Sequence, residues 1–268
     1  METPDATFFI VTGVPRSGTT LLCNLLNRFE NIVCLNEIPA LYDVSRMPQT
    51  FGTIEHRLRS GLKIPMTVKA DGELITDTQN QEYAVRDVRV EVDPDAALWV
   101  GSKINQPYLK QIDIIRRHGF RGIAVLRDPV YAVASWNKHA KIINEANVMP
   151  EDFAKWPRYG RFYFAYPDRY RRQMEIFQHL SHTIYQNPGL LLPVWYEELA
   201  ARPSRTLYRC LSWIGADRLN TLRLKPGGIG PIKNLNDPAR FDPPEMAKIQ
   251  DAATVVLENT QGGNAHAL

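Results

Sequence analysis

The sequence predicts an α/β fold in which a central parallel sheet is flanked by helices. Two short, continuous apolar runs, at 8–12 and 123–126, are each followed by a helical pattern, and a third run at 190–195 precedes another helix. Continuous apolar strands that alternate with helices are typical of a parallel sheet covered on both faces. We therefore expect these three runs to belong to one sheet.

The composition limits the class of protein. The chain has 268 residues, 44% of them hydrophobic, and a net charge of +3, so its length fits one α/β domain or two small ones. No apolar run reaches the ~20 residues that span a bilayer, and the polar N-terminus is unlike a secretory signal. The small net charge does not indicate nucleic-acid binding. Three widely spaced cysteines predict no disulfide framework, so we expect a cytoplasmic protein; they are Cys23, Cys34 and Cys210.

The clearest unit begins at the first apolar run. Phe8 to Thr12 predicts a short buried strand, and the apolar residues from Leu21 to Phe29 recur at helical spacing. Between them lies a loop with a glycine near each end, residues 13–18, which we call the glycine loop. A strand, a glycine-rich loop and a helix in this order are the setting in which such a loop binds phosphate.

Residue types in and after the glycine loop suit an anion. Glycine lets the backbone approach closely, and N–H groups and hydroxyls at a helix start can then bind the anion. The predicted binding residues are Pro15, Arg16, Ser17, Gly18, Thr19 and Thr20. The alternative is an ordinary glycine-rich turn. The glycine spacing is that of a P-loop, but Thr19 stands where an ATP-binding loop has lysine, so we expect a nucleotide without a γ-phosphate.

The second and third units repeat the strand–helix order. After 123–126, Asp128 is suited to cap a helix and Pro129 to occupy its first position. In the run at 190–195, Pro193 argues against a central strand. The helix that follows is expected to end at Gly215. The polar segment 39–97 and the tail after 227 are expected to lie outside the sheet.

The glycine loop and three later motifs resemble the PAPS-dependent sulfotransferases (PAPS is 3′-phosphoadenosine 5′-phosphosulfate). The loop resembles their 5′-phosphosulfate loop, and Arg127 followed eight positions later by Ser135 resembles the pair that holds the 3′-phosphate. Residues 195–199, with Tyr196, resemble the late strand and helix start of the family. Residues 225–234, with Lys233 and Asn234, resemble its C-terminal glycine loop, although Ile232 replaces the usual tryptophan. The resemblance implies a P-loop type, sulfotransferase-like fold.

The resemblance also implies a catalytic group. Asn105 stands where the cytosolic branch has its histidine base, and an amide cannot act as a base. The tyrosylprotein type is more similar in the loop, and its glutamate base corresponds to Glu37, with Lys103 and Arg16 stabilising the leaving phosphate. Each of these two roles has an alternative interpretation. Glu37 could be a surface carboxylate that caps a helix, and Lys103 could be an exposed lysine at the end of a strand. His139 is an alternative base.

We therefore expect sulfuryl transfer from PAPS to a hydroxyl, or less readily an amine, on a small-molecule, glycan or peptide acceptor, with release of PAP (the desulfated nucleotide). The family needs no metal, and we expect none. We expect one domain over 1–268, with acceptor-side insertions near 39–97 and 137–165.

The alternative functions are those of a P-loop small-molecule kinase and of a non-catalytic nucleotide or nucleic-acid binding module. The latter would use the aromatic–basic stretch 156–172, for which an ordinary helix with buried aromatics and exposed arginines is the simpler interpretation.

Overall fold

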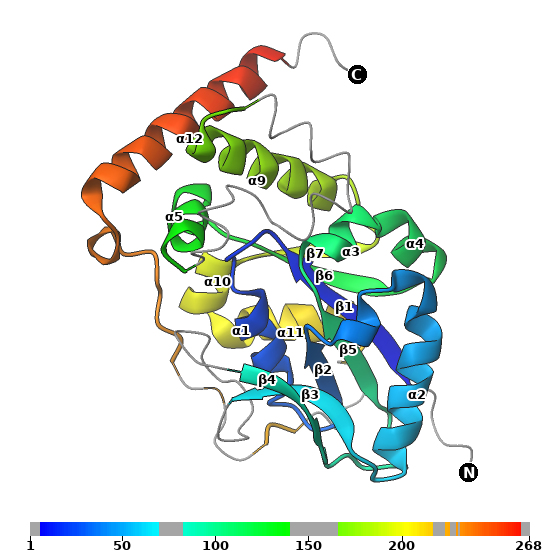
Figure 1. The fold of residues 1–268 in the computed structure, drawn as a ribbon. Coiled ribbons are helices and arrows are strands. Elements are labelled where there is room, and N and C mark those ends of the chain that lie inside the picture. Colours follow the sequence, from blue (N-terminus) through cyan, green and yellow to red (C-terminus); the bar gives the residue numbers. More distant parts are fainter. Residues whose placement is uncertain are drawn as a thin grey trace.

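A computed structural model describes residues 6–69, 83–139, 166–216, 223–225, 229 and 231–263. It confirms the predicted parallel sheet, whose five strands run in the order β2-β5-β1-β6-β7 with every neighbouring pair parallel (Figure 1). The strands are β1 (Thr7–Gly13), β2 (Ile32–Asn36), β5 (Trp99–Lys103), β6 (Arg121–Leu126) and β7 (Leu191–Trp195). Pro193 lies in β7, an edge strand, where a missing N–H donor is tolerated.

Helices cover both faces of the sheet (Figure 1). One face packs against α1 (Thr19–Leu26) and α11 (Pro203–Trp213), and α10 (Tyr196–Ala201) begins directly after β7. The other face packs against α2 (Met47–Arg59), α3 (Gln106–Lys110), α4 (Ile112–Arg117) and α9 (Arg169–Tyr185). Successive residues of a strand serve opposite faces, as Phe9 and Ile10 do in β1. This explains why the strands read as continuous apolar runs.

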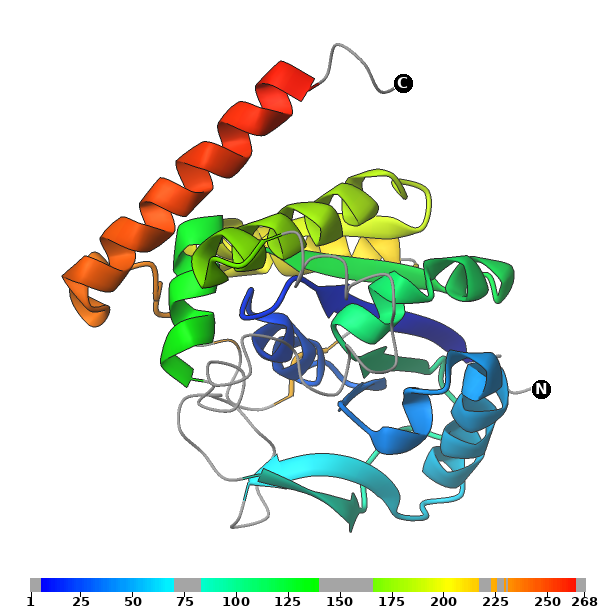
Figure 2. The ribbon, with the colours of Figure 1, turned by 45° about the horizontal axis from the view of Figure 1, so that its top comes forward.

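Two further helices pack on the side of the sheet that α9 covers, one against the sheet beside α9 and one outside it. α5 (Pro129–His139) follows β6, and Asp128 Oδ1 accepts from the N–H of Val130 at 2.9 Å, so the predicted cap is confirmed. α12 (Pro243–Gly263) packs across α5 and α9 and extends outward beyond them (Figure 2). The tail after 227 lies outside the sheet, as expected, and contains this 21-residue helix, which was not predicted.

The segment 39–97 lies outside the main sheet, as expected, but it is more regular than its weak periodicity indicated. It contains α2, two short 3-10 helices (Pro39–Leu41 and Val44–Arg46), and a separate antiparallel pair, β3 (Ile64–Lys69) with β4 (Tyr83–Val88). Four residues of α2, Met47, Phe51, Ile54 and Leu58, are buried in the core. The Thr67 hydroxyl donates to the Asn36 carbonyl, which joins this pair to the end of β2.

The aromatic–basic stretch is only partly described, because residues 156–165 lie outside the described residues. Its helix, α9, begins only at Arg169, with Asp168 Oδ1 accepting from the N–H of Arg171. The expectation that all arginines face water was wrong for Arg172, which is 2% exposed and donates to the Tyr166 carbonyl at 2.7 Å. Of the segment 137–165, residues 137–139 belong to α5, and 140–165 lie outside the described residues.

The connections fix where the sheet can bind a ligand. The chain leaves β1 through α1 toward β2, on one side, whereas it leaves β6 through α5 and α9 toward β7, on the other. Neighbouring strands whose connections diverge leave a crevice at their carboxyl ends, which is the usual ligand site of such sheets. The glycine loop and Arg127 flank this crevice.

Candidate active site

Each of the five parallel strands has a predicted site residue at or just after its carboxyl end. Glu37 follows β2, Lys103 ends β5, the glycine loop follows β1, Arg127 follows β6 and Tyr196 follows β7. Because these ends meet at one edge of the sheet, residues as far apart in the chain as Gly13 and Tyr196, 183 positions, come together. The sheet thus places these predicted residues along one edge.

The two glycines of the loop are required by its shape. Gly13 has φ 154°, and a Cβ there would lie 2.2 Å from the Val125 carbonyl oxygen of β6. Gly18 has φ 94°, and a Cβ there would lie 2.8 Å from Cδ2 of the Tyr196 ring. Glycine therefore lets the loop lie directly against β6 and Tyr196.

Ser17 does not direct its hydroxyl outward. The side chain is fully buried and its Oγ lies 2.7 Å from the Val14 carbonyl and 2.8 Å from the Val125 carbonyl, so it anchors the loop to β6. An anion at this position would be left with the N–H groups that begin α1, which have no intrahelical partner. Pro15 and Thr19 are buried and Thr20 is half-buried.

Arg16 occupies the left-handed region, with φ 62°, which is uncommon for a residue with a side chain. Its Nε lies 3.4 Å from Oγ of Ser135 on α5, and its carbonyl accepts from Nη1 of Arg127 at 3.0 Å. The two predicted cation positions and Ser135 are thus joined around the crevice. Ser135 is 7% exposed, so it is also a packing residue of α5.

Arg127 is the most deeply placed cation of this crevice. It is 4% exposed, its Nε donates to Asn236 Oδ1 at 2.7 Å, and its guanidinium lies 4.8 Å from the centre of the Tyr196 ring. Its Nη2 is buried and has no hydrogen-bond partner among the residues that the structure describes. Burial lowers the pKa of Arg127 from its ordinary value. A buried donor of this kind fits an anionic ligand.

Tyr196 holds the C-terminal segment 231–237, which we call the strap. The Tyr196 hydroxyl donates to the Lys233 carbonyl and accepts from the Leu235 N–H, both at 3.0 Å. Burial raises the pKa of Tyr196 above its ordinary value. Lys233 and Asn234 are exposed, and Asn234 Oδ1 accepts from the N–H of Asn236, so the side chain of Asn234 shapes the strap itself.

Glu197 and Asn236 belong to this site but were not predicted. Glu197 Oε1 lies 2.5 Å from Asn236 Nδ2 and 3.0 Å from the Asp128 N–H, and Asn236 also contacts Arg127. In the sequence, Glu197 is indistinguishable from the neighbouring Glu198, which forms an exposed ion pair with Arg209. The two carboxylates differ only in their position around helix α10, which places Glu197 against the strap and Glu198 against Arg209.

Glu37 and Lys103 form an ion pair at the β2–β5 end of the edge. Lys103 Nζ lies 2.5 Å from Glu37 Oε1, and the Glu37 N–H donates to the Lys103 carbonyl at 2.9 Å. The Lys103 side chain is 3% exposed and that of Glu37 is 34% exposed. The alternative interpretation of Lys103 as an exposed strand-end lysine is therefore wrong. Glu37 has φ 52°, so the carboxylate is held at a sharp left-handed turn.

Asn105 lies after β5, and its carbonyl accepts from the Thr12 hydroxyl at 2.7 Å. Its Oδ1 is buried without a partner among the described residues. His139 ends α5, but its side chain lies outside the described residues. Its role as an alternative base stays a prediction.

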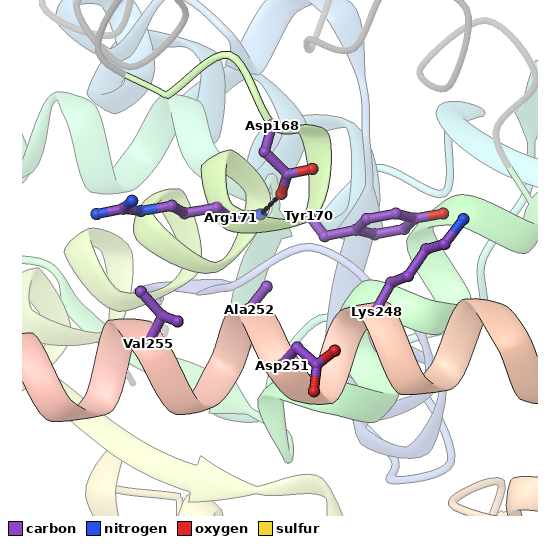
Figure 3. Close-up of a pocket in the computed structure, with 7 residues that line it drawn as sticks. All are labelled: Asp168, Tyr170, Arg171, Lys248, Asp251, Ala252 and Val255. Carbon is purple, nitrogen blue, oxygen red and sulfur yellow. Dashed lines mark hydrogen bonds between the residues drawn. The ribbon is translucent and has the colours of Figure 1, made fainter.

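Other features of the described residues lie apart from this edge. No described helix is long and apolar enough to cross a membrane. Within the described ranges, no group of three or more His, Cys, Asp or Glu residues could hold a metal. A pocket of about 340 Å³ lies between α9 and α12 and is lined by none of the strand-end residues (Figure 3); its lining includes Tyr170, Arg171 and Lys248.

Comparisons with known proteins give the family. Three solved structures are similar. A sulfotransferase domain from the curacin biosynthetic pathway is 13% identical with a TM-score of 0.46, and the match covers 80% of this chain and 75% of that chain. A sulfotransferase from Alicyclobacillus acidocaldarius is 16% identical with a TM-score of 0.40 (94% of this chain, 96% of that chain), and the sulfotransferase domain of the Synechococcus PCC 7002 olefin synthase is 15% identical with a TM-score of 0.45 (100% and 97%). No curated protein matches. With TM-scores this low, the assignment depends on the family model described as the sulfotransferase family, which matches residues 8–219. The chain belongs to the sulfotransferase family.

Proposed function

We propose that this protein transfers a sulfuryl group from PAPS to a hydroxyl, or less readily an amine, and releases PAP. The observation that carries the proposal is Arg127, a cation that is 4% exposed and whose Nη2 has no partner among the described residues. It borders the crevice beside the glycine loop. A buried guanidinium with an unused donor is suited to a phosphate, and PAPS differs from most nucleotides in carrying one at its 3′ position.

The other end of the nucleotide would lie at the glycine loop. The N–H groups that begin α1, together with the hydroxyls of Thr19 and Thr20, would bind the 5′-phosphosulfate. Arg127 and Ser135 would bind the 3′-phosphate, with Tyr196, Lys233 and Asn234 on the side of the strap. Pro15 and Ser17 would shape the loop rather than bind through their side chains.

Glu37 and Lys103 supply the chemistry at the acceptor end. The Glu37 carboxylate takes the proton from the acceptor hydroxyl, whose oxygen forms a bond to sulfur as the bond from sulfur to the bridging phosphate oxygen breaks. Lys103 and Arg16 stabilise the negative charge that develops on that bridging oxygen. Glu37 holds the proton after the transfer, and the electron pair of the broken bond stays on the phosphate oxygen of PAP. No metal is needed to complete this step.

One ligand would bring together residues from 13–20, 127–135 and 233–236, and we therefore propose that the chain acts as a single catalytic domain. The acceptor is a small molecule, glycan or peptide with a hydroxyl. Three buried free thiols, those of Cys23, Cys34 and Cys210, fit a reducing compartment such as the cytoplasm.

Nucleotide binding and transfer test the proposal directly. We expect PAP to bind and to raise the Tm of the full chain, whereas MgATP at the same concentration should not. Labelled PAPS should then pass its label to one class in a panel of phenols, sugars, peptides and amines. Tight MgATP binding without PAP binding would contradict the proposal and favour a kinase.

Glu37→Gln tests the proposed base. The amide keeps the shape of the carboxylate but cannot take a proton, so we expect kcat to fall by about 10²–10⁴-fold with little change in the Kd of PAP. The measurement is steady-state turnover with the acceptor found in the panel. A kcat close to the wild-type value with an unchanged pH profile would remove Glu37 from the mechanism and leave His139 as the next residue to test.

A further inference from the structure

Glu197 is a carboxylate in the site that the proposed transfer does not use. It follows Tyr196 at the start of α10. Its Oε1 accepts from the Asp128 N–H at 3.0 Å and from Asn236 Nδ2 at 2.5 Å, whereas its Oε2 is buried without a partner among the described residues. One carboxylate thus joins α10 to the turn after β6 and to the strap.

Both contacts of Glu197 lead to Arg127. Asp128 is the next residue in the chain, so its N–H bond fixes the turn from which the Arg127 side chain extends. Asn236 accepts from Arg127 Nε through Oδ1 at 2.7 Å and donates to Glu197 through Nδ2. Because an amide has one donor end and one acceptor end, these two partners set its orientation. Asn236 therefore bridges the carboxylate and the guanidinium.

The charges around Arg127 give the carboxylate a second effect. Burial lowers the pKa of Arg127, and the nearby Arg16 and Arg240 lower it further, whereas Tyr196 and Glu197 act in the opposite direction. Glu197 therefore supports the charged form of a buried cation. A carboxylate that acts through an intervening amide stabilises the charge of the cation and leaves its donors available to a phosphate. A direct ion pair would instead compete with the phosphate for those donors.

We propose that Glu197 is a positioning residue for the 3′-phosphate: through Asn236 and the Asp128 N–H it orients Arg127 and ties the strap beside it. This inference rests on the proposed function. It predicts that Glu197 affects recognition of the 3′-phosphate and not of the rest of the nucleotide. It also predicts that Glu197 and Asn236 act as one unit.

The test compares the Kd of PAP with that of AMP, which lacks only the 3′-phosphate, for the full chain. The wild-type protein should prefer PAP strongly. In Glu197→Gln and in Asn236→Ala, we expect the Kd of PAP to rise by about tenfold and that of AMP to stay unchanged. The double variant should be no weaker than the weaker single variant, because the two residues share one bridge. Glu198→Gln is the matched control and should keep the wild-type preference.

The outcomes separate the two proposals. A wild-type protein that binds PAP and AMP equally would overturn the proposed function, and this inference with it. A wild-type preference that persists in both single variants would overturn the inference alone. Equal losses of PAP and AMP affinity, or additive losses in the double variant, would also overturn it, because they indicate a purely structural role. If Glu197→Gln does not fold, Asn236→Ala, in the strap, decides the question.

Discussion

At the β2–β5 end of the site, the buried Lys103 ammonium meets the Glu37 carboxylate directly at 2.5 Å. At the β6–β7 end, the buried Arg127 guanidinium is hydrogen-bonded only to neutral oxygens within the described residues, those of Arg16 and Asn236. The first pair is neutral as a unit before any ligand arrives. The second cation keeps an unused donor, and its carboxylate, Glu197, is one amide away. One edge of the sheet thus holds a cation that is paired directly at one end and, at the other, a cation that keeps an unused donor.

The largest expected effect comes from breaking the direct pair. In Glu37→Ala, Lys103, which is 2% exposed in the wild-type protein, loses its partner, and we expect the free energy of unfolding to fall by about 3 kcal/mol. Lys103→Met leaves the carboxylate, which is 34% exposed and can be solvated, so it should cost less than about 1 kcal/mol. Urea unfolding of both variants measures the asymmetry.

Glu198→Ala is the matched control for this asymmetry. It breaks the exposed pair with Arg209 and should cost less than about 1 kcal/mol. If Glu37→Ala and Lys103→Met lose equal stability, Lys103 does not depend on Glu37 for its charge, and the comparison between the two ends of the site loses its basis.

The second prediction concerns the open end. Arg127→Met replaces a buried charge that lacks a direct ion pair, so we expect the stability of the free protein to change by no more than about 1 kcal/mol. The affinity for PAP should nevertheless fall by about 100-fold, because the ligand loses its charged donor. Thermal unfolding with and without PAP measures both quantities. A large loss of stability without PAP, equal to that of Glu37→Ala, would show that Arg127 is a structural cation.

The sequence predicted those parts of the site that local patterns determine. The apolar run, the glycines at 13 and 18 and the cap at Asp128 depend on neighbours a few residues away, and all are found as expected. The position of β5 between β2 and β1 depends on pairing between segments that are distant in the chain. The burial of Lys103, at the end of β5, could therefore not be predicted from local patterns.

The contacts of Glu197 escaped prediction for the same kind of reason. Its partner Asn236 is 39 positions away in a strap without secondary structure. Nothing local distinguishes it from Glu198. The helices α2 and α12 were missed although their buried apolar residues recur at helical spacing, from Met47 to Leu58 and from Met246 to Val256. The surfaces that bury them, the sheet and α9, are distant in the chain.

Both ends of the site share one feature, a side-chain-bearing residue in the left-handed region. Glu37 has φ 52° and Arg16 has φ 62°; the third such residue among those described is Asn31, a type that tolerates this region. Strain of this kind persists where the surroundings impose it, and it is common at functional sites. At Glu37, the N–H bond to the Lys103 carbonyl is one such constraint on the backbone.

The smallest expected effect measures this strain. Glu37→Gly and Glu37→Ala both remove the carboxylate, so the loss of the ion pair cancels between them. The glycine variant should be more stable by about 1 kcal/mol, since relief of the left-handed strain exceeds the entropy that glycine adds to the unfolded chain. The same pair at Arg16 should show a similar difference. If alanine proves as stable as glycine at 37 but not at 16, backbone strain is stored only at Arg16, and the turn at Glu37 is held by the ion pair with Lys103 alone.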